Sequence, residues 1–446
     1  MHFDNFYGTD YKLQRYKVMK VKLLSMLMIG AVAFANAQDK SLLETLVKKG
    51  TISEQEAAQI AKDSVVVTPG TSDTKKLTIN GGVDVRYNLG DNKVKSGGEQ
   101  NANTNGFELR YAKLGVAAEI QGGWMVDFVT DFGVEGRERN FLDKVVISKK
   151  IALDYLTGTL DVGLRKVNMG QEQNLDDFGL YTPERSVATW FFTRPDYGTD
   201  AQKNFGSRAI GLFWDGTIEQ VPGLYYGLAV VGGNSYEGST ASLSNFEGNN
   251  NLSFYANVGY TGEQAIKNES FTYDVGLNFG YANGGFYDDT KPSVKNEIWG
   301  VNPYVSVNWR GLNFLAEYFI QSVQNGKYNT DDRATPMGFN ATLAYKFDLG
   351  EFGALEPVFR ASMIASDGMG FNPVTMGSFS TPVVGNLYDR AQTYYIGANW
   401  YVVPSVKIGV GYEWGEYSNG GNIGRAGQTA TRAVSNAVRA QLQVLF

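Results

Sequence analysis

The stretch 433-AVSNAVRAQLQVLF-446 at the end of the chain decides the fold class, because it alternates strictly between apolar and polar residues. Neighbouring residues of a β-strand point to opposite faces. One face would therefore carry Val438, Ala440, Leu442, Val444 and Phe446, and the other Arg439, Gln441 and Gln443. An apolar strand edge in water promotes aggregation. The pattern favours a closed barrel in lipid, with one face towards acyl chains and the other towards a wet lumen.

The same alternation divides the chain from Lys76 onward into sixteen segments of strand length. Composition agrees, because 53 Gly, 26 Tyr and 26 Phe against 11 Pro suit many twisted strands with interface aromatics. The predicted strands are Lys76–Leu89, Gly106–Ile120, Gly122–Val134, Leu142–Leu156, Gly158–Val167, Gly206–Gly216, Gly223–Asn234, Asn250–Tyr260, Glu269–Tyr281, Ile298–Trp309, Gly311–Ser322, Met337–Phe347, Gly353–Ala365, Ala391–Val402, Pro404–Glu416 and Ala433–Phe446.

The connections between these segments alternate between long and short. The long, polar ones are Gly90–Asn105, Glu135–Phe141, Asn168–Phe205, Ser235–Asn249, Ala282–Glu297, Val323–Pro336, Ser366–Arg390 and Tyr417–Arg432. The short ones include the single residues Gln121, Thr157, Arg310 and Val403, while Thr261–Asn268 is less tight. Long external loops, short periplasmic turns and an even strand count typify bacterial outer-membrane barrels with both termini in the periplasm. A soluble sandwich or propeller would not require this asymmetry.

The N-terminal part predicts export. Residues 1–37 have the pattern of a signal peptide, with lysines before the apolar stretch Val21–Ala37 and Ala35-Asn36-Ala37 at its end. Met19 is an alternative initiator. Residues 38–75 then predict a short periplasmic helical segment over Asp39–Ser64 and a linker. Two readings of that segment stay open, a helical hairpin near the barrel mouth or a small coiled coil that joins protomers. The whole pattern predicts an all-β, 16-stranded antiparallel transmembrane barrel, residues 76–446, in the outer membrane of a Gram-negative bacterium.

Missing residue types exclude several functions. The chain has no cysteine, and its one histidine, His2, lies in the predicted signal peptide. Ser-His-Asp catalysis and thiolate or histidine metal sites are therefore excluded, so we expect neither an enzyme nor a bound metal or cofactor. The net charge of −6 becomes about −9 when the basic leader is removed, which argues against nucleic acid as a partner.

The longest connection, Asn168–Phe205, is the predicted functional loop. It contains seven aromatic residues, including Trp190, Phe191 and Phe192, so it is too apolar for a solvated tether. A 16-stranded barrel leaves an aqueous channel, and a loop of this size can fold inward and narrow it. We therefore expect a constriction formed by 168–205.

Several segments resemble the phosphate-selective porins O and P. The longest is GLRKVNMGQEQNLDDFGLYTPERSVATWFF at 163–192, and FELRYAKLGVAAEI at 107–120 and YYIGANWYVVPSVKIGVGY at 394–412 add to it. The resemblance implies a homotrimeric outer-membrane channel for small anions such as phosphate. It matches Arg110 and Lys113 to basic strand positions and Glu184 and Arg185 to a loop pair. The chain departs from the family at Tyr111, often Arg in the family, and at 167–169.

The candidate pore residues are basic positions on inferred inward faces, on the strand that the resemblance matches (Arg110 and Lys113) or on the long loop: Arg86, Arg110, Lys113, Arg165, Arg185, Arg194, Lys203, Arg360, Lys407 and Arg439. The alternative for Arg86, Arg165, Arg360, Lys407 and Arg439 is a wall position paired with carboxylates across strands. The loop carboxylates Glu172, Asp176, Asp177 and Glu184 are expected to fix the loop to the wall.

The function that these observations predict is passive diffusion of small hydrophilic solutes, with anions preferred. Two alternatives are a general or weakly cation-preferring pore and a barrel that tethers envelope layers through Asp39–Ser64. The terminal aromatic Phe446 resembles the signal that the barrel-assembly machinery reads. The expected partners are thus outer-membrane lipid, small solutes and that machinery.

Overall fold

The computed structural model describes residues 73–95, 100–134, 141–193, 205, 208–232, 252–266, 269–283, 297–327, 332–371, 388–418 and 432–446. The predicted signal peptide, the helical segment and the linker up to residue 72 lie outside the described residues, as do Arg194 and Lys203. None of the described helices is long and apolar enough to cross a membrane.

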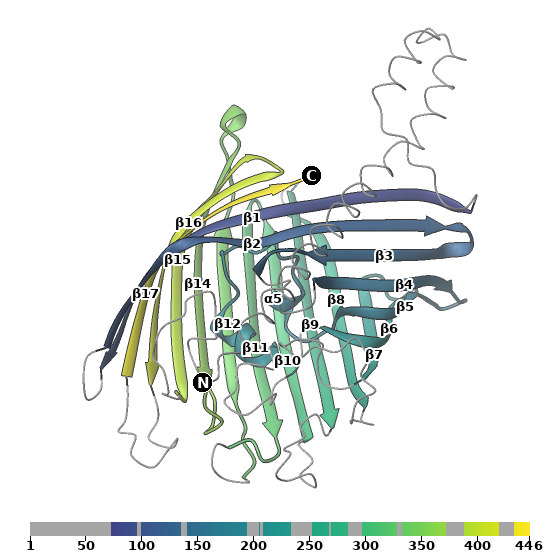
Figure 1. Cartoon of the computed structure of the whole chain (residues 1–446). Helices are drawn as coiled ribbons and strands as arrows, with labels where there is room; N and C mark the ends of the chain where they lie inside the picture. The colour runs from purple at the N-terminus through teal and green to yellow at the C-terminus, as the bar shows by residue number, and fades with distance from the viewer. Residues whose placement is uncertain are drawn as a thin grey trace, which may run out of the picture. The chain divides into compact units, whose positions relative to one another are not determined.

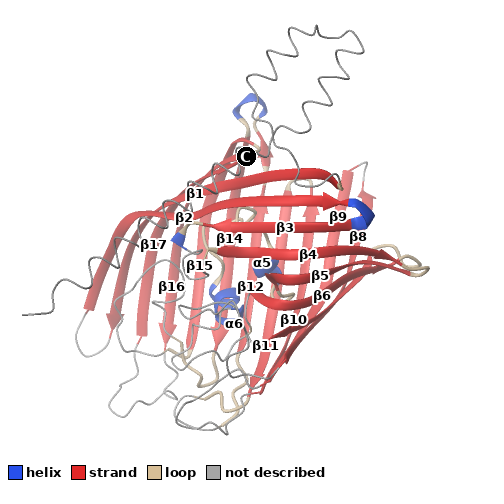
Figure 2. Ribbon diagram, turned by 45° about the vertical axis from the view of Figure 1, so that its right-hand side comes forward, coloured by secondary structure: helices blue, strands red, loops and turns tan. Residues whose placement is uncertain are grey.

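The chain forms a closed antiparallel β-barrel of sixteen strands (Figures 1 and 2). The strands are β1 (Thr74–Lys95), β2 (Gln100–Ile120), β3 (Trp124–Asp131), β4 (Leu142–Ala152), β5 (Leu156–Lys166), β6 (Arg208–Ile218), β7 (Leu224–Gly232), β8 (Leu252–Ile266), β9 (Glu269–Asn283), β10 (Glu297–Trp309), β11 (Leu312–Val323), β12 (Met337–Tyr345), β13 (Phe347–Asp348), β14 (Ala354–Ala365), β15 (Arg390–Val403), β16 (Val406–Ser418) and β17 (Arg432–Leu445). The two-residue β13 continues β12, since both pair with β14, so the two count as one strand.

The first and last strands close the barrel. β1 pairs with β17 over fourteen positions, from Gly82 opposite Leu445 to Lys95 opposite Arg432. The backbone of Phe446 completes the seam, because its N–H donates to Gly81 O at 3.1 Å and its O accepts from Gly81 N–H at 3.0 Å. No sheet edge is left for another chain to extend.

The chain divides into two compact units, and the smaller one contains the ends of β1, β2 and β3. In the smaller unit, Met1–Ile79 with Val116–Met125, the N–H of Gln121 donates to Asp73 O, and Lys76 lies 3.7 Å from Glu119. The larger unit, Asn80–Gly115 with Val126–Phe446, contains the barrel wall and everything described below.

The two faces of the strands differ as the alternation predicts. On β17, Val438, Leu442 and Val444 are exposed, whereas Arg439, Gln441 and Gln443 are buried. β1 repeats the pattern, with Val83, Val85 and Leu89 exposed and Asp84, Arg86 and Asn88 buried. An apolar outer surface and a polar inner one are what a barrel in lipid requires.

The two ends of the barrel also differ. The connections after β1, β3, β5, β7, β9, β11, β14 and β16 lie at one end, which we call the long-loop end; the other, which holds Phe446, is the short-turn end. The tightest short turn, Arg310-Gly311, has φ values of 50° and 82°, the left-handed pair that joins twisted hairpin strands.

Several predicted connections were wrong in length or position. β1 continues to Lys95 and β2 begins at Gln100, so only 96–99 remain of the predicted loop Gly90–Asn105, and β8 likewise continues to Ile266. Thr157 lies in β5 and Val403 in β15, and Gln121 belongs to the three-residue turn 121–123. The strands run on because backbone pairing can continue beyond the apolar belt, where polar residues on both faces erase the alternation.

Buried apolar side chains line the inner wall at the long-loop end. We call this group the apolar collar; it takes one or more residues from each of nine strands, β6–β11, β14, β15 and β17. Representatives in strand order are Ala209, Ala229, Tyr255, Ala282, Ile298, Phe319, Ile364, Ala391 and Ala433. The described residues of β1–β5 contribute none.

Candidate functional site in the barrel interior

The connection between β5 and β6 runs inside the barrel and contains two short helices, α5 (Gln171–Asn174) and α6 (Val187–Thr193). Figure 2 shows both among the strands, and all seven residues of α6 are buried. Ser186 caps α6, because its Oγ accepts from Thr189 N–H at 3.1 Å. The distant strand β11 supports α5, since the N–H groups of Gln171 and Glu172 donate to the Glu317 carboxylate at 2.6 and 3.3 Å.

Aromatic rings of this connection lie against wall glycines. A Cβ added to Gly82 on β1 would stand 2.7 Å from the Phe178 ring, and one added to Gly338 on β12 would stand 2.5 Å from the Phe192 ring. Both distances are too short for any larger residue, so glycine leaves the space that each ring occupies. The loop and the wall are therefore shaped to each other.

Glu184 joins the loop to the first two strands. Its Oε1 accepts from Arg86 Nη1 at 2.5 Å, and its Oε2 accepts from Arg110 Nη2 at 3.1 Å. Arg86 also donates twice to Asp84 Oδ2, at 2.8 and 3.0 Å. All four residues are buried, so these are charge-assisted bonds in a low-dielectric environment.

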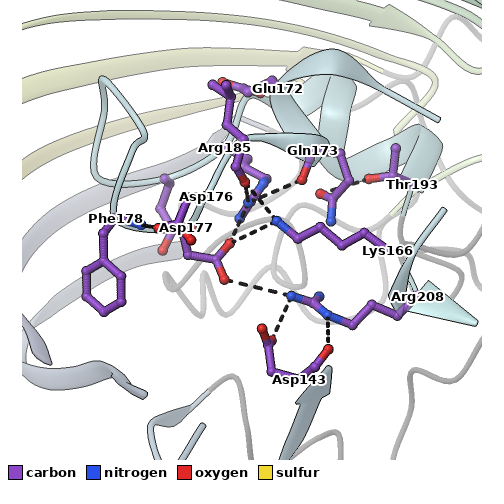
Figure 3. A network of polar contacts seen from close by, with 12 residues as sticks. Asp143, Lys166, Glu172, Gln173, Asp176, Asp177, Phe178, Arg185, Thr193 and Arg208 are labelled. Atoms are coloured by element: carbon purple, nitrogen blue, oxygen red, sulfur yellow. Dashed lines mark hydrogen bonds and ion pairs between the residues drawn. The ribbon is translucent and has the colours of Figure 1, made fainter. Parts of the chain in front are cut away.

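Asp177 is the centre of a second network (Figure 3). Lys113 and Arg185 bond directly to its two carboxylate oxygens, Arg185 at 2.5 Å. Lys166 Nζ and Arg208 Nη2 lie 3.7 and 3.8 Å away. Burial alone would raise the pKa of Asp177, but the four cations hold it well below its usual value. The same carboxylate raises the pKa of Arg185 despite burial.

One further carboxylate shares these cations. Asp143 on β4 lies 2.9 Å from Lys113 Nζ and 2.7 Å from Arg208 Nη2. In this cluster two carboxylates, Asp143 and Asp177, therefore face four basic side chains.

Strands β14 and β16, which lie four and two strands from β1 in the sheet, also hold the loop. Arg360 on β14 donates to Thr182 Oγ1 at 2.6 Å and to the carbonyl oxygen of Glu184. Lys407 on β16 donates to the carbonyl oxygens of Phe178 and Leu180 at 3.0 and 2.9 Å. The segment therefore has polar contacts with β14 and β16 as well as with β1 and β2.

Six of the ten predicted basic residues make hydrogen bonds that hold the loop, five of them from the wall and Arg185 from the loop itself: Arg86, Arg110, Lys113, Arg185, Arg360 and Lys407. The other two described ones pair on the wall, Arg165 with Asp161 and Asp215, each at 2.5 Å, and Arg439 with Glu413 at 2.6 Å. The alternative prediction for the wall residues was pairing with carboxylates. Arg86, Arg165, Arg360 and Arg439 are paired in this way, whereas Lys407 donates to backbone carbonyl oxygens. Of the loop carboxylates, Asp177 and Glu184 fix the loop as expected, whereas Asp176 is exposed.

Sequence reasoning missed Arg208, Lys166 and Tyr111. By simple alternation Arg208 would share the face of the exposed Leu212, yet it turns to Asp143 and Asp177 at the start of β6. Tyr111 follows the inward Arg110 directly and is nevertheless buried, so the alternation breaks between them, as at a β-bulge. The one available signal was that Tyr111 departs from the resembled family.

A cavity of about 770 Å³ lies beside the Asp177 network. Its lining includes residues of β1–β6, the loop residues Asp176 and Phe178, and Phe446 at the short-turn end. Within the described residues, no group of three or more His, Cys, Asp or Glu side chains is placed to hold a metal ion. The arrangement can bind or pass a solute, and it offers charge and hydrogen bonds for doing so.

Neither a protein-family model nor a curated protein sequence matches this chain. Among solved structures, the outer membrane channel DcaP of Acinetobacter baumannii matches with a TM-score of 0.51 at 10% identity, over 85% of this chain and 99% of that one. OmpF of Salmonella typhi follows with 0.49 at 17% identity over 83% and 98%, and OprB of Pseudomonas putida with 0.48 at 11% over 82% and 94%. At 10% identity the match to DcaP shows the fold alone, an antiparallel β-barrel. The resemblance to phosphate-selective porins stays a prediction.

Proposed function

We propose that this protein is an outer-membrane porin through which small hydrophilic solutes diffuse passively, with small anions such as phosphate preferred. In this proposal the long-loop end faces the outside, and both termini lie in the periplasm. A homotrimer, by the resemblance, and assembly through Phe446 belong to the same proposal. So does a role in trimer contact or envelope tethering for residues 38–75.

The connection 168–205 is the proposed constriction. Its support is that α5 and α6 contact β11, β12 and β14, while Glu184 and Asp177 reach β1 and β2. A segment held on several walls of the lumen reduces the cross-section that a solute can use. It also brings charged groups to the narrowest level, where they act most strongly on a passing ion.

The observation that carries the anion preference is the cluster of four basic side chains around Asp143 and Asp177. Anion selectivity requires local positive charge beside the path rather than a positive chain as a whole. Lys113, Lys166 and Arg208 of this cluster line the 770 Å³ cavity. A solute in the cavity is therefore adjacent to these basic side chains.

The test is the reversal potential in a planar bilayer under a KCl gradient. Lys166→Gln removes the most exposed charge of the four cations, and Lys346→Gln removes an exposed lysine outside the cavity. We expect anion preference in the native protein, a shift towards cations in K166Q and no shift in K346Q. Cation preference in the native protein would favour the general-pore alternative. Absence of any conductance would contradict the porin itself.

A further inference from the structure

The apolar collar restricts where water can cross the barrel. Its buried side chains cover the inner wall from β6 to β17 at the long-loop end, and a dry apolar surface offers no hydrogen bonds to a hydrated solute. On β1 and β3 the described buried side chains are polar, among them Asn88 and Asp131, and on β2 Arg110 is buried next to Tyr111. This contrast favours the β1–β4 side for a wet path.

Two polar features lie on this same side, one partly exposed and one buried without a protein partner. Glu108 on β2 keeps a side-chain exposure of 15%, although it is bonded to Arg110. Asn88 Oδ1, beside it on β1, has no protein hydrogen bond within the described part of the chain, and a buried oxygen of this kind is usually hydrated. Towards the short-turn end, the 770 Å³ cavity begins at Lys113, also on β2. The distance along β2 from Glu108 to Lys113 is about 17 Å at ~3.4 Å per residue.

Tyr111 lies between these two regions. Its ring is 2% exposed, and three cations surround it: Arg86 and Lys113 at 5.3 Å from the ring centroid and Arg110 at 5.6 Å. The ring of the loop residue Phe178 meets it edge-on at 6.0 Å. The negative face of an aromatic ring attracts cations, so Tyr111 both fills space and holds positive charge in place.

We propose that solutes pass along the inner face of β2 and that Tyr111 sets the size and charge limit of this path. The ring closes the gap between the wall and Phe178, and the cations on it select small anions. Replacement by a smaller residue opens the gap to larger anions. This inference rests on the proposed porin function and adds the route and the limiting residue.

The first experiment compares the permeation of chloride and gluconate in planar bilayers. Tyr111→Ala is expected to raise the gluconate-to-chloride permeability ratio about twofold or more, because the pore widens. Tyr111→Phe keeps the ring and should keep the native ratio. The control Tyr395→Ala removes a tyrosine that is equally buried, lies 5.9 Å from Arg360 and packs near the loop residue Tyr181, but stands on β15. An equal rise in Y395A, or no rise in Y111A, would overturn the proposal.

The second experiment maps the water path without relying on conductance. The chain has no cysteine, so single cysteines can be introduced without background. Folded Asn88→Cys and Ala391→Cys proteins are treated with sulfonatoethyl methanethiosulfonate, and labelling is measured by mass. We expect position 88 on the β1 wall to react and position 391 in the apolar collar to stay unlabelled. Faster labelling at 391 would refute the route, whereas labelling at 88 in a protein that does not conduct would refute the porin function alone.

Discussion

Replacement of Asp177 by Asn is predicted to release the connection 168–205 from the wall while the barrel stays closed. The change removes the carboxylate that Lys113, Lys166, Arg185 and Arg208 share and leaves them only Asp143 within the network. Asp177 holds none of the strand pairs together, so the β-ladders have no reason to break.

The magnitude follows from the burial of the group. Removal of one partner from a buried ion pair costs about 3–5 kcal/mol, because the remaining charges stay desolvated. Lys166 keeps 21% exposure, so water can reach part of the cluster, and the lower end of that range applies. A loss of about 3 kcal/mol raises the undocked population roughly 100-fold.

The assay is hydrogen–deuterium exchange of the detergent-solubilised protein. The reporters are the backbone N–H groups within the loop helices, such as Asn174, which donates to Gly170 O, and Trp190, which donates to Ser186 O. Their exchange should accelerate about 100-fold in D177N, since each 1.4 kcal/mol changes the open population tenfold. Strand amides of β14 and β15 should stay protected.

The matched control is Asp176→Asn. Asp176 is the preceding residue and carries the same charge, but it is exposed, and its carboxylate accepts the N–H of Phe178 at 2.8 Å. Its replacement should change loop exchange by less than about tenfold, since exposed polar substitutions cost little. Equal exchange in D177N and the native protein would refute the role of Asp177 as the anchor, and equal acceleration in both variants would show a general charge effect.

Three further predictions concern pH, packing and assembly. The neighbouring cations hold the pKa of Asp177 below its usual value, so the stability that the Asp177 carboxylate contributes is complete above the unfolded pKa of about 3.9 and is lost only as pH falls through the lower folded pKa. Hydrogen exchange of the loop, corrected for intrinsic rates, should therefore be unchanged between pH 7 and pH 4.5, and a release of the loop near pH 5 would contradict this prediction. Gly338→Ala should destabilise loop docking by about 1–3 kcal/mol through collision with Phe192, whereas Gly106→Ala, with open space around it, should not, as exchange at α6 would show. Phe446→Ala should reduce the amount of heat-modifiable barrel in outer membranes but leave single-channel conductance intact; normal assembly would refute the signal.

The strands were predictable because their burial pattern is local. In β17 and β1 each residue meets lipid or the interior according to its parity, so the sequence alone reveals which face it occupies. The antiparallel pairing of the first strand with the last also follows from an even number of strands. The predicted strand boundaries were wrong where the alternation of apolar and polar residues ends, as in β8, which continues to Ile266 through polar residues.

The interior network was not predictable, because its contacts join residues far apart in the chain. Glu184 meets Arg86 across 98 residues, and Lys407 meets Phe178 across 229. No periodicity links such positions. Arg208 was missed because it lies at the start of a strand, and Tyr111 because the alternation breaks beside it. Both side chains are therefore buried, although alternation places them on the exposed face.

By itself, the sequence determined the alternation of the strands, their number and the position of the long connection 168–205, because a period of two and the length of a loop can be read residue by residue. Only the tertiary structure decided which wall residues Glu184 and Asp177 contact and that the apolar collar takes no residue from the described part of β1–β5. The physical reason is that the burial of a charge or a ring depends on what the rest of the barrel brings against it.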